Sequence, residues 1–493
     1  MLFHSWYFLI FFIIVYSVYL PLRGTRFYLY WLLLASYFFY GWWNPLYLIL
    51  IAYCTVTNYY AVVLMQKSQR KKIWLIASVV NSLVVLCFFK YGGFITTNFN
   101  ILFTSLGISY TIPKPGILLP VGISFYTFHA MSYTIDYYRG YIKREPSLIR
   151  FATFISFFPQ LVAGPILRAS DMLPQFTGKP EIRRENITDG LSLFVVGLFK
   201  KVALADYLAL YVDKVYNAPS LFDGTSLIFA TFAFGWQIYF DFSGYTDMAR
   251  GISRMMGFNL KLNFNNPYLA ISLGDFWNRW HISLSSWFKD YVYIPLGGNR
   301  KGKFNTYKNM FLTMVISGFW HGAAWTFIIW GALHALGRFI TRELERTDFY
   351  NDKVPKILKQ IYVFAFVSFA WIFFRAQSLG DAVLIVKKIF TSGFTNPNFP
   401  IVALSFCFII WIYQFLFESS LNGLLAKLSV FSHSRENGNP LSRHSFTLDS
   451  SFRWNDIIDL AIKSAKVITV ILMIIYMVIF TTSGNEAFIY FQF

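Results

Sequence analysis

Long apolar runs recur along the whole chain and constrain its fold more than any other feature. A helix needs about 20 apolar residues to cross the hydrocarbon core of a bilayer. Of the 493 residues 56% are hydrophobic and only 14% are charged, which excludes a soluble globule with an ordinary polar surface. We therefore predict an all-α polytopic transmembrane bundle with roughly ten to twelve spans. The runs are Trp6–Leu20, Phe27–Tyr40, Leu46–Met65, Ile73–Phe89, Ile117–Tyr138, Leu191–Val202, Leu227–Phe242, Met310–Leu336, Ile357–Phe374, Val402–Phe417 and Val467–Phe480.

Positively charged side chains lie in the short loops between these runs. The formal net charge of +19 could indicate a nucleic-acid partner. Short loops rich in Lys and Arg, however, stay on the cytoplasmic side of a membrane and so orient its helices. Residues 66–72 and 139–144 are such loops, Arg23 and Arg26 join them, and the turn Gly41–Pro45 is uncharged. We therefore predict membrane lipid rather than nucleic acid as a partner, and a periplasmic or exterior N-terminus.

Sequence signals for a metal or a bound cofactor are absent. Cys54, Cys87 and Cys407 lie within apolar runs and have neither disulfide nor zinc spacing. The sequence contains no phosphate loop, no dinucleotide-binding glycine pattern and no metal-ligand cluster. We therefore expect no metal and no bound cofactor, so that any activating energy arrives in the substrate itself.

Prolines and glycines interrupt the apolar pattern after residue 112. Such breaks free backbone groups that lipid cannot satisfy, so they persist only beside protein or a wet cavity. Charged and aromatic side chains mix between Asp241 and Lys308, which we interpret as interfacial helices on the cytoplasmic side. The predicted parts are an N-terminal transmembrane scaffold (1–112), a core with re-entrant segments (113–340), C-terminal transmembrane helices with a polar cytoplasmic loop at 431–459 (341–482), and an aromatic tail (483–493).

His321 lies in an apolar stretch and is a candidate for chemistry. A polar ring inside a membrane segment costs free energy unless it has a partner, so such histidines tend to line a cavity. A neutral imidazole is a suitable general base toward a hydroxyl group. Gly318 and Gly322 leave room for a substrate beside the ring. The alternative is a core histidine that is hydrogen-bonded to a neighbouring backbone carbonyl.

His281 is a second candidate. It follows Trp280 and precedes Ser283, Ser285 and Ser286. It could orient the first imidazole or hydrogen-bond the substrate. It could equally be an interfacial side chain whose polar edge faces water.

A third histidine, His129, shares one helical face with Tyr126, Tyr133 and Asp136. This spacing favours a structural hydrogen-bond network over a catalytic role.

Basic residues near His281 suit phosphate groups. Arg and Lys side chains both bind phosphate, as in a cytosolic nucleotide-type donor. The alternative is helix orientation by positive charge, which is favoured for two of these residues, Lys301 and Lys303. The basic residues concerned are Arg279, Lys289, Arg300, Lys301 and Lys303.

Several short stretches carry a resemblance to a known family. They are Pro120–Phe128, Phe158–Pro165, Asp241–Ala249, Asn265–Tyr268, Asp275–His281, Tyr293–Gly298 and Gly318–Gly322. In these stretches the chain resembles the membrane-bound O-acyltransferase family, and within it the bacterial branch of alginate and peptidoglycan O-acetyltransferases. The resemblance runs from about residue 113 to 340, and the earlier spans are similar in character.

The resemblance implies a multi-pass O-acyltransferase of the bacterial inner membrane. Its all-helical bundle would have a cytoplasmic funnel for the acyl donor and an outer cavity, joined by a narrow passage. His321 corresponds to the family's invariable histidine, and His281 to its second, more variable one. The implied donor is acetyl-CoA or another acyl thioester, and the acceptor is an extracytoplasmic polysaccharide. A separate periplasmic or extracellular protein of the SGNH-hydrolase kind would deliver the acetyl group.

Residues in and beside these motifs are expected to complete the site. Asn278 or His281 could stabilise the oxyanion that develops as a hydroxyl attacks the thioester. We expect donor or substrate binding by Asn278, Arg279, Trp320, Ser317, Trp280 and Asp275.

The chain ends in an aromatic tail, Phe488–Phe493, which is expected to be extracytoplasmic. It is similar to the tail of a small partner protein in teichoic-acid D-alanylation, where a tyrosine is thought to carry the acyl group. We therefore hypothesise that Tyr490 relays the acyl group outward from the region of His321. The alternative is an interfacial aromatic anchor.

Two other functions are also compatible with the sequence. One is D-alanyl transfer from a carrier protein to teichoic acid, within the same family. The other is transport or flipping of a glycan, which broken helices would also permit. Consumption of a thioester distinguishes the second, because a transporter consumes none.

Overall fold

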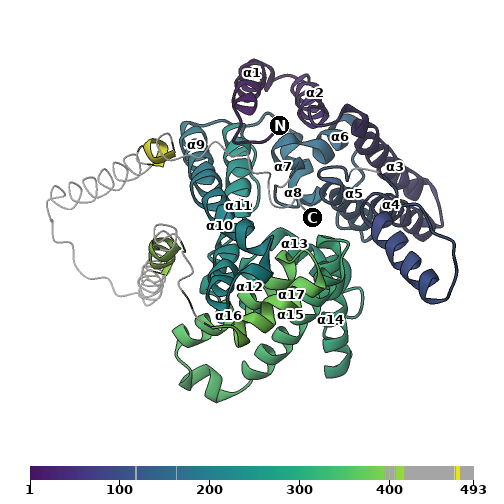
Figure 1. Cartoon of the computed structure of the whole chain (residues 1–493). Coiled ribbons are helices and arrows are strands. Elements are labelled where there is room, and N and C mark those ends of the chain that lie inside the picture. The colour runs from purple at the N-terminus through teal and green to yellow at the C-terminus, as the bar shows by residue number, and fades with distance from the viewer. Residues whose placement is uncertain are drawn as a thin grey trace, which may run out of the picture.

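The computed structural model is helical in the residues that it describes, and this part of the chain contains no strand (Figure 1). It describes residues 1–116, 119–162, 164–393, 395, 399, 405, 407–415, 471 and 473–477. The predicted loop at 431–459 and Tyr490 lie outside the described residues.

The N-terminal helices are tied to the centre of the bundle. Tyr16 and Tyr19 donate hydrogen bonds to the carbonyl oxygens of Met255 (3.0 Å) and Met256 (2.7 Å), at the end of a central helix. The fourth helix is longer than the predicted run Ile73–Phe89, because it continues to Ser105. The elements are α1 (Trp6–Leu22), α2 (Tyr28–Gly41), η1 (Pro45–Tyr47), α3 (Leu48–Lys67) and α4 (Lys71–Ser105).

Short helices follow α5 and lie deep in the molecule, although the chain there is irregular. Phe157, Phe158 and Leu161 are fully buried. Gly122, just before α5, has a φ of +75°, and a Cβ there would meet the carbonyl oxygen of Leu161. Glycine is therefore required where the start of α5 crosses this broken segment. The elements are α5 (Ile123–Tyr138), α6 (Leu148–Ser156), α7 (Phe158–Leu161), α8 (Ala169–Met172) and η2 (Leu173–Phe176).

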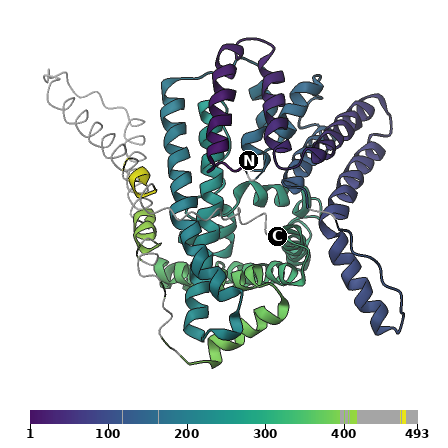
Figure 2. The same cartoon turned by 45° about the horizontal axis from the view of Figure 1, so that its top comes forward.

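Helices α9 and α11 stand side by side and pack through glycine (Figures 1 and 2). Gly190 and Gly197 of α9 face Gly251 and Gly244 of α11, and a Cβ at any of the four would meet backbone atoms of the facing segment. Small residues thus allow close backbone approach, as is common between membrane helices. The elements are α9 (Arg184–Phe199), the π-helical η3 (Lys200–Ala205), α10 (Asp206–Tyr216), η4 (Pro219–Leu221) and α11 (Gly224–Met255).

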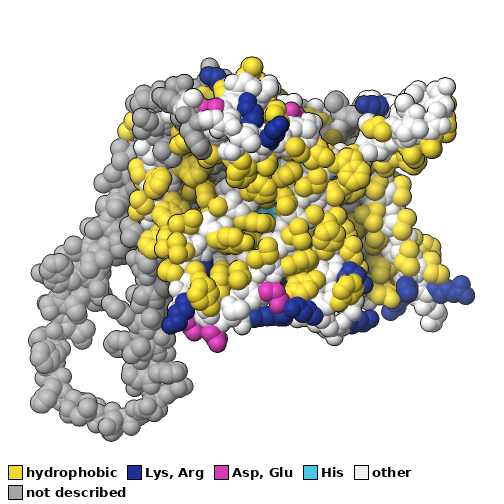
Figure 3. Space-filling view, turned by 60° about the horizontal axis from the view of Figure 1, so that its bottom comes forward, with side chains coloured by type: hydrophobic (Ala, Val, Ile, Leu, Met, Phe, Trp, Pro, Cys, Tyr) yellow, Lys and Arg dark blue, Asp and Glu magenta, His cyan; other side chains and the backbone are white. Residues whose placement is uncertain are grey.

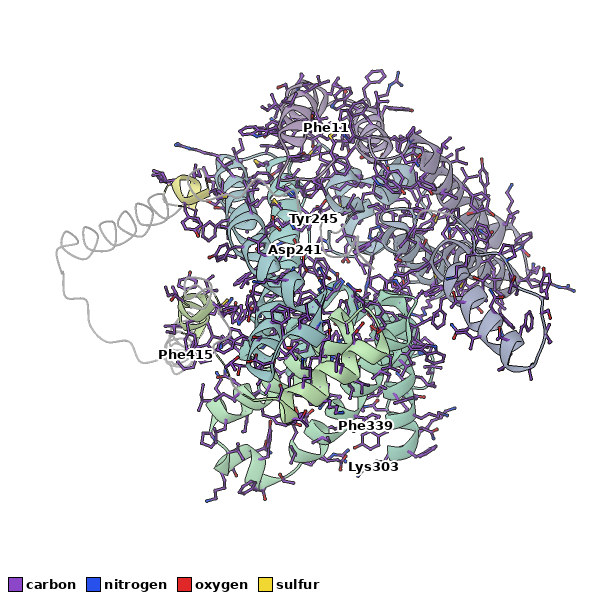
Figure 4. The ribbon with its side chains drawn as sticks, viewed as in Figure 1. Phe11, Asp241, Tyr245, Lys303, Phe339 and Phe415 are labelled. Atoms are coloured by element: carbon purple, nitrogen blue, oxygen red, sulfur yellow. The ribbon has the colours of Figure 1, made fainter. Side chains whose placement is uncertain are left out.

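Buried charges join the same layer of helices. The Nζ of Lys201, a residue that is 1% exposed, lies 2.7 Å from an oxygen of Asp206 and 2.8 Å from one of Asp241. Asp241 lies on α11 in the interior of the bundle (Figure 4). The prediction of interfacial helices from Asp241 onward is therefore wrong at its start, since α11 continues to Met255. Ion pairing between helices is what makes these charges tolerable there.

The C-terminal half contains a helical hairpin, α14–α15, that the sequence pattern did not predict. The run Met310–Leu336 is not one helix, because α14 ends at His321 and α15 begins at Trp325. A Cβ at Gly318 or Gly331 would meet a backbone carbonyl of the other helix, so the hairpin is tight. The elements are η5 (Pro267–Leu269), α12 (Leu273–Arg279), α13 (Ile282–Phe288), the π-helical η6 (Lys289–Tyr293), α14 (Gly302–His321), α15 (Trp325–Leu344), the π-helical η7 (Phe349–Lys353), α16 (Lys356–Arg375) and α17 (Leu379–Thr391).

The outer surface suits a membrane. Figure 3 shows a broad band of hydrophobic side chains between two edges where charged side chains gather. Three helices of the described part are long and apolar enough to cross a bilayer, namely Pro45–Lys67, Lys71–Ser105 and Lys356–Arg375. Other helices are shorter or, like α11, carry polar groups that face protein rather than lipid. The number of spans, predicted as roughly ten to twelve, stays a prediction.

Candidate active site

His321 ends α14, at the tip of the hairpin. It is 4% exposed, and its ring lies edge-on against Trp320 and Trp330 at centroid distances of 4.9 and 5.1 Å. The next residue, Gly322, leaves the helix in an extended conformation, and a Cβ there would meet the ring of Phe327. The break after His321 therefore depends on glycine and places the imidazole at a helix end.

Two side chains of α4 hold this helix end. Lys90 Nζ donates hydrogen bonds to the carbonyl oxygens of Trp320 (2.6 Å) and His321 (2.9 Å). The Tyr91 hydroxyl donates to the carbonyl oxygen of Phe319 (3.0 Å). The last carbonyls of a helix have no partner within the helix, so α4 supplies the donors that α14 lacks.

His281 is held rigidly just before α13. It is fully buried, and its backbone adopts the left-handed region with φ 43° and ψ 52°, which is uncommon for residues other than glycine. Its Nδ1 lies 3.2 Å from Asn263 Oδ1, which also accepts a hydrogen bond from the Ser283 hydroxyl (2.9 Å). The alternative of an interfacial side chain facing water is wrong, because no part of His281 reaches solvent.

Both histidines contact the same indole. The ring centroid of Trp320 lies 4.9 Å from that of His321 and 6.5 Å from that of His281. Trp320 in turn stacks on Phe128 of α5 at 5.3 Å. The structure thus brings His281, His321 and Trp320 together, as a shared site requires.

A cavity of about 450 Å³ lies between α12, α13, α14 and α15. Its lining includes Ser317, one helical turn before His321, and Asn278. Lys289, Arg338 and Arg342 also line it, so it is basic. We name it the inner cavity.

A second, smaller cavity of about 70 Å³ is lined by His321 itself, together with Trp320 and Lys90. A third cavity, of about 310 Å³, shares Val121 and Val162 with it and reaches the turn between α2 and α3. We name these two the outer cavities. His321 therefore lines the small outer cavity, and Ser317 of the same helix lines the inner cavity.

The remaining predicted site residues lie elsewhere around α12. Asp275 and Arg279 pair with each other at 2.8 Å, and Asp275 also accepts a hydrogen bond from the backbone N–H of Ile271 at 3.1 Å. Trp280 is 1% exposed and stacks on Phe276. These contacts shape α12, and a binding role for the three residues stays a prediction.

Two further buried histidines line none of these three cavities. His129 is fully buried, and within the described residues neither of its ring nitrogens has a hydrogen-bond partner. The predicted network around it is therefore wrong, since Asp136 instead accepts a hydrogen bond from Tyr291 at 2.8 Å. His334 of α15 is also fully buried and contacts the rings of Trp277 and Trp330.

Sequence reasoning missed three residues of this region. Lys90 stands directly after the run Ile73–Phe89, and a lone lysine in otherwise apolar sequence was the available signal. Arg338 and Arg342 lie four residues apart on α15 and therefore share a helical face, but the apolar run before them obscured that pattern.

The arrangement defines a membrane-embedded site, in which a buried histidine stands at the end of a helix that lines both a basic cavity and a second, smaller one. The family model described as "MBOAT, membrane-bound O-acyltransferase family" matches residues 139–380. The chain belongs to this family. It is an acyltransferase with an all-α membrane fold, as predicted.

Three proteins of named activity are similar to this chain. "Probable alginate O-acetylase AlgI" of Pseudomonas aeruginosa is 43% identical over 400 residues, covering 80% of this chain and 75% of that protein. "Peptidoglycan O-acetyltransferase" of Helicobacter pylori is 39% identical over 387 residues, covering 72% of each. "Teichoic acid D-alanyltransferase" of Streptococcus thermophilus is 32% identical over 235 residues, covering 45% of this chain and 56% of that protein.

Proposed function

We propose that this protein moves an acetyl group from cytosolic acetyl-CoA to a hydroxyl group of an extracytoplasmic polysaccharide of the alginate or peptidoglycan type. The observation that carries the proposal is the place of His321, which lines the small outer cavity while Ser317, one turn earlier, lines the inner cavity. The names of the alginate O-acetylase and the peptidoglycan O-acetyltransferase support acetyl as the acyl group and a polysaccharide as the acceptor.

In the proposed mechanism the imidazole of His321 takes the proton of an acceptor hydroxyl. The hydroxyl oxygen attacks the thioester carbonyl carbon, the new C–O bond forms, and the C–S bond breaks. Asn278 or His281 stabilises the oxyanion of the tetrahedral intermediate by hydrogen bonding. The thiolate leaves into the inner cavity, and the proton held by His321 passes to it.

The inner cavity supports the choice of a phosphate-bearing donor. Three basic residues, Lys289, Arg338 and Arg342, line it, and both Arg and Lys bind phosphate well. Of the cations that the sequence suggested for this role, Lys289 lies in the cavity wall. Lys303 instead lies at the edge of the bundle and pairs with Glu343 at 2.8 Å (Figure 4).

Replacing Arg342 with alanine is expected to raise the KM for acetyl-CoA with little change in kcat. A charge-assisted hydrogen bond contributes about 1.5–3 kcal/mol, so the expected rise is roughly tenfold to a hundredfold. Initial rates of thiol release at varied acetyl-CoA measure both constants. The Lys303→Ala variant, which removes an exposed cation, is the control and should match the wild type. An unchanged KM in Arg342→Ala would exclude the inner cavity as the binding site of the donor.

We further propose a position in the bacterial inner membrane, with the inner cavity open to the cytoplasm and the N-terminus and aromatic tail outside. A separate SGNH-hydrolase-type protein would then carry the acetyl group to the polysaccharide. The experiment uses purified protein in nanodiscs with that partner, acetyl-CoA and alginate or peptidoglycan fragments. Release of free thiol together with new acetyl esters is the expected result, whereas glycan movement without thiol release would indicate a transporter.

D-alanyl transfer is the second candidate, because the teichoic acid D-alanyltransferase is a relative over part of the chain. The same assay distinguishes it when a D-alanyl carrier protein replaces acetyl-CoA as the donor. Transfer from the carrier protein but not from acetyl-CoA would favour this second function.

The Tyr490 relay stays part of the proposal. In the relay, the hydroxyl that attacks the thioester is that of Tyr490. Tyr490→Phe, which removes only this hydroxyl, is therefore expected to abolish acetyl transfer to the partner protein. Partner acetylation by labelled acetyl-CoA is the measurement. Undiminished labelling in this variant would favour the interfacial anchor.

A further inference from the structure

The C-terminal turn of α14 is held by another helix at three consecutive carbonyl groups. Lys90 and Tyr91 of α4 donate to the carbonyl oxygens of Phe319, Trp320 and His321 at 3.0, 2.6 and 2.9 Å. The rings of Tyr91 and Phe319 also stack at a centroid distance of 4.2 Å. The backbone that carries the imidazole is therefore attached directly to α4.

A lysine is unusual at position 90 of helix α4. It lies in the middle of an apolar helix that is long enough to cross a membrane, where an ammonium group is costly. Within the described residues it pairs with no carboxylate. Its partners are the two carbonyl oxygens and the indole of Trp320, whose centroid lies 5.5 Å from Nζ.

The charge of Lys90 fits the helix end that it contacts. The C-terminus of a helix carries partial negative charge on its unsatisfied carbonyls, so a cation stabilises it. Lys90 also lines the small outer cavity together with His321.

We propose that Lys90 is a positioning residue for His321. With Tyr91 it clamps the last turn of α14 and so sets where the imidazole stands between the inner and outer cavities. The inference rests on the proposed acetyl transfer and adds to it a residue that lies outside the lining of the inner cavity. Misplacement of a catalytic group by about 1 Å can lower a rate about a hundredfold.

The test compares Lys90→Met, which keeps the length of the side chain but loses the charge and the donors, with Lys90→Arg, which keeps both. In the nanodisc assay Lys90→Met is expected to lower kcat roughly a hundredfold per folded molecule, because the histidine is no longer held in place. The KM for acetyl-CoA should stay within twofold, since other helices line the inner cavity. Lys90→Arg should recover most of the lost kcat. Tyr91→Phe removes one of the three hydrogen bonds and should lower kcat about fivefold.

The matched control is Lys72→Met, the same change at the exposed end of the same helix. It should leave kcat and KM unchanged. An unchanged kcat in Lys90→Met, a change in KM alone, or no recovery in Lys90→Arg would each overturn the inference.

A second measurement needs no turnover and so separates this inference from the proposed function. Backbone amide exchange of residues 315–325 in the same nanodiscs should be faster in Lys90→Met than in the wild type and unchanged in Lys72→Met. If the wild type consumes no acetyl-CoA but the exchange rates differ in this way, the proposed function fails while the clamp stands. Equal exchange in Lys90→Met and the wild type would overturn the clamp whatever the activity.

Discussion

Replacing His321 with alanine is expected to lower the kcat of acetyl transfer by about 10²–10⁴-fold, the range that a positioned general base contributes. His321 lines the small outer cavity, and the previous turn of its helix lines the inner cavity. The small outer cavity is lined by two titratable side chains, His321 and Lys90, and the Nζ of Lys90 donates hydrogen bonds to backbone carbonyl oxygens of α14. The KM for acetyl-CoA should change little, because the residues of the inner cavity are untouched. Thiol release from acetyl-CoA in nanodiscs gives both constants.

His129→Phe is the matched control for this experiment. His129 is buried as completely as a catalytic histidine, but it lies on α5, and its ring has no hydrogen-bond partner within the described residues. Phenylalanine fills a similar volume, so this variant should fold and keep its turnover. A His321→Ala protein that elutes from a size-exclusion column like the wild type and retains the full kcat would exclude His321 as the general base.

Replacing Lys201 with methionine is expected to destabilise the protein by about 3–5 kcal/mol, the usual effect of removing one member of a buried ion pair. Asp206 and Asp241 would both lose the ammonium group that lies 2.7 and 2.8 Å from them. Both carboxylates lie in the interior, where desolvation of an uncompensated charge is costly. Tryptophan fluorescence, recorded during unfolding in detergent, measures the change in the free energy of unfolding.

Arg183→Met provides the comparison at the surface. Arg183 pairs with Glu181 at 2.9 Å, but both side chains are more than 70% exposed, at 73% and 75%. Such pairs contribute at most about 1 kcal/mol, so this variant should unfold close to the wild type. Neutralising all three buried groups, with Lys201→Met, Asp206→Asn and Asp241→Asn together, should recover part of the lost stability. Equal unfolding of Lys201→Met and the wild type would show that the triad contributes no stability.

The helical fold was predictable because the apolar runs are local patterns. A run of about 20 apolar residues can satisfy its backbone in lipid only as a helix, whatever its neighbours do. The boundaries were less predictable. The run Met310–Leu336 reads as one helix, and its break at Gly322 depends on the ring of Phe327, which packs there only after the chain has folded back.

Part of the candidate site could be proposed from the sequence for a similar reason. His321 stood out because a titratable ring in apolar sequence needs a structural or chemical explanation. Ser317 and Asn278 were predicted beside it, and the structure places both in the wall of the inner cavity. Lys90 was missed because its role depends on a contact with residues far along the chain, which no local pattern reports.

By itself, the sequence determined that this chain is a helical membrane protein and marked His321 as a candidate for its chemistry, since both conclusions follow from the cost of placing polar groups in hydrocarbon. Only the tertiary structure decided where that histidine stands. Lys90 and Asp241 look alike in the sequence, as charges beside apolar runs. The folded chain gives Asp241 an ammonium partner within the bundle and gives Lys90 the free carbonyls of α14, because partners of buried charges come from other helices.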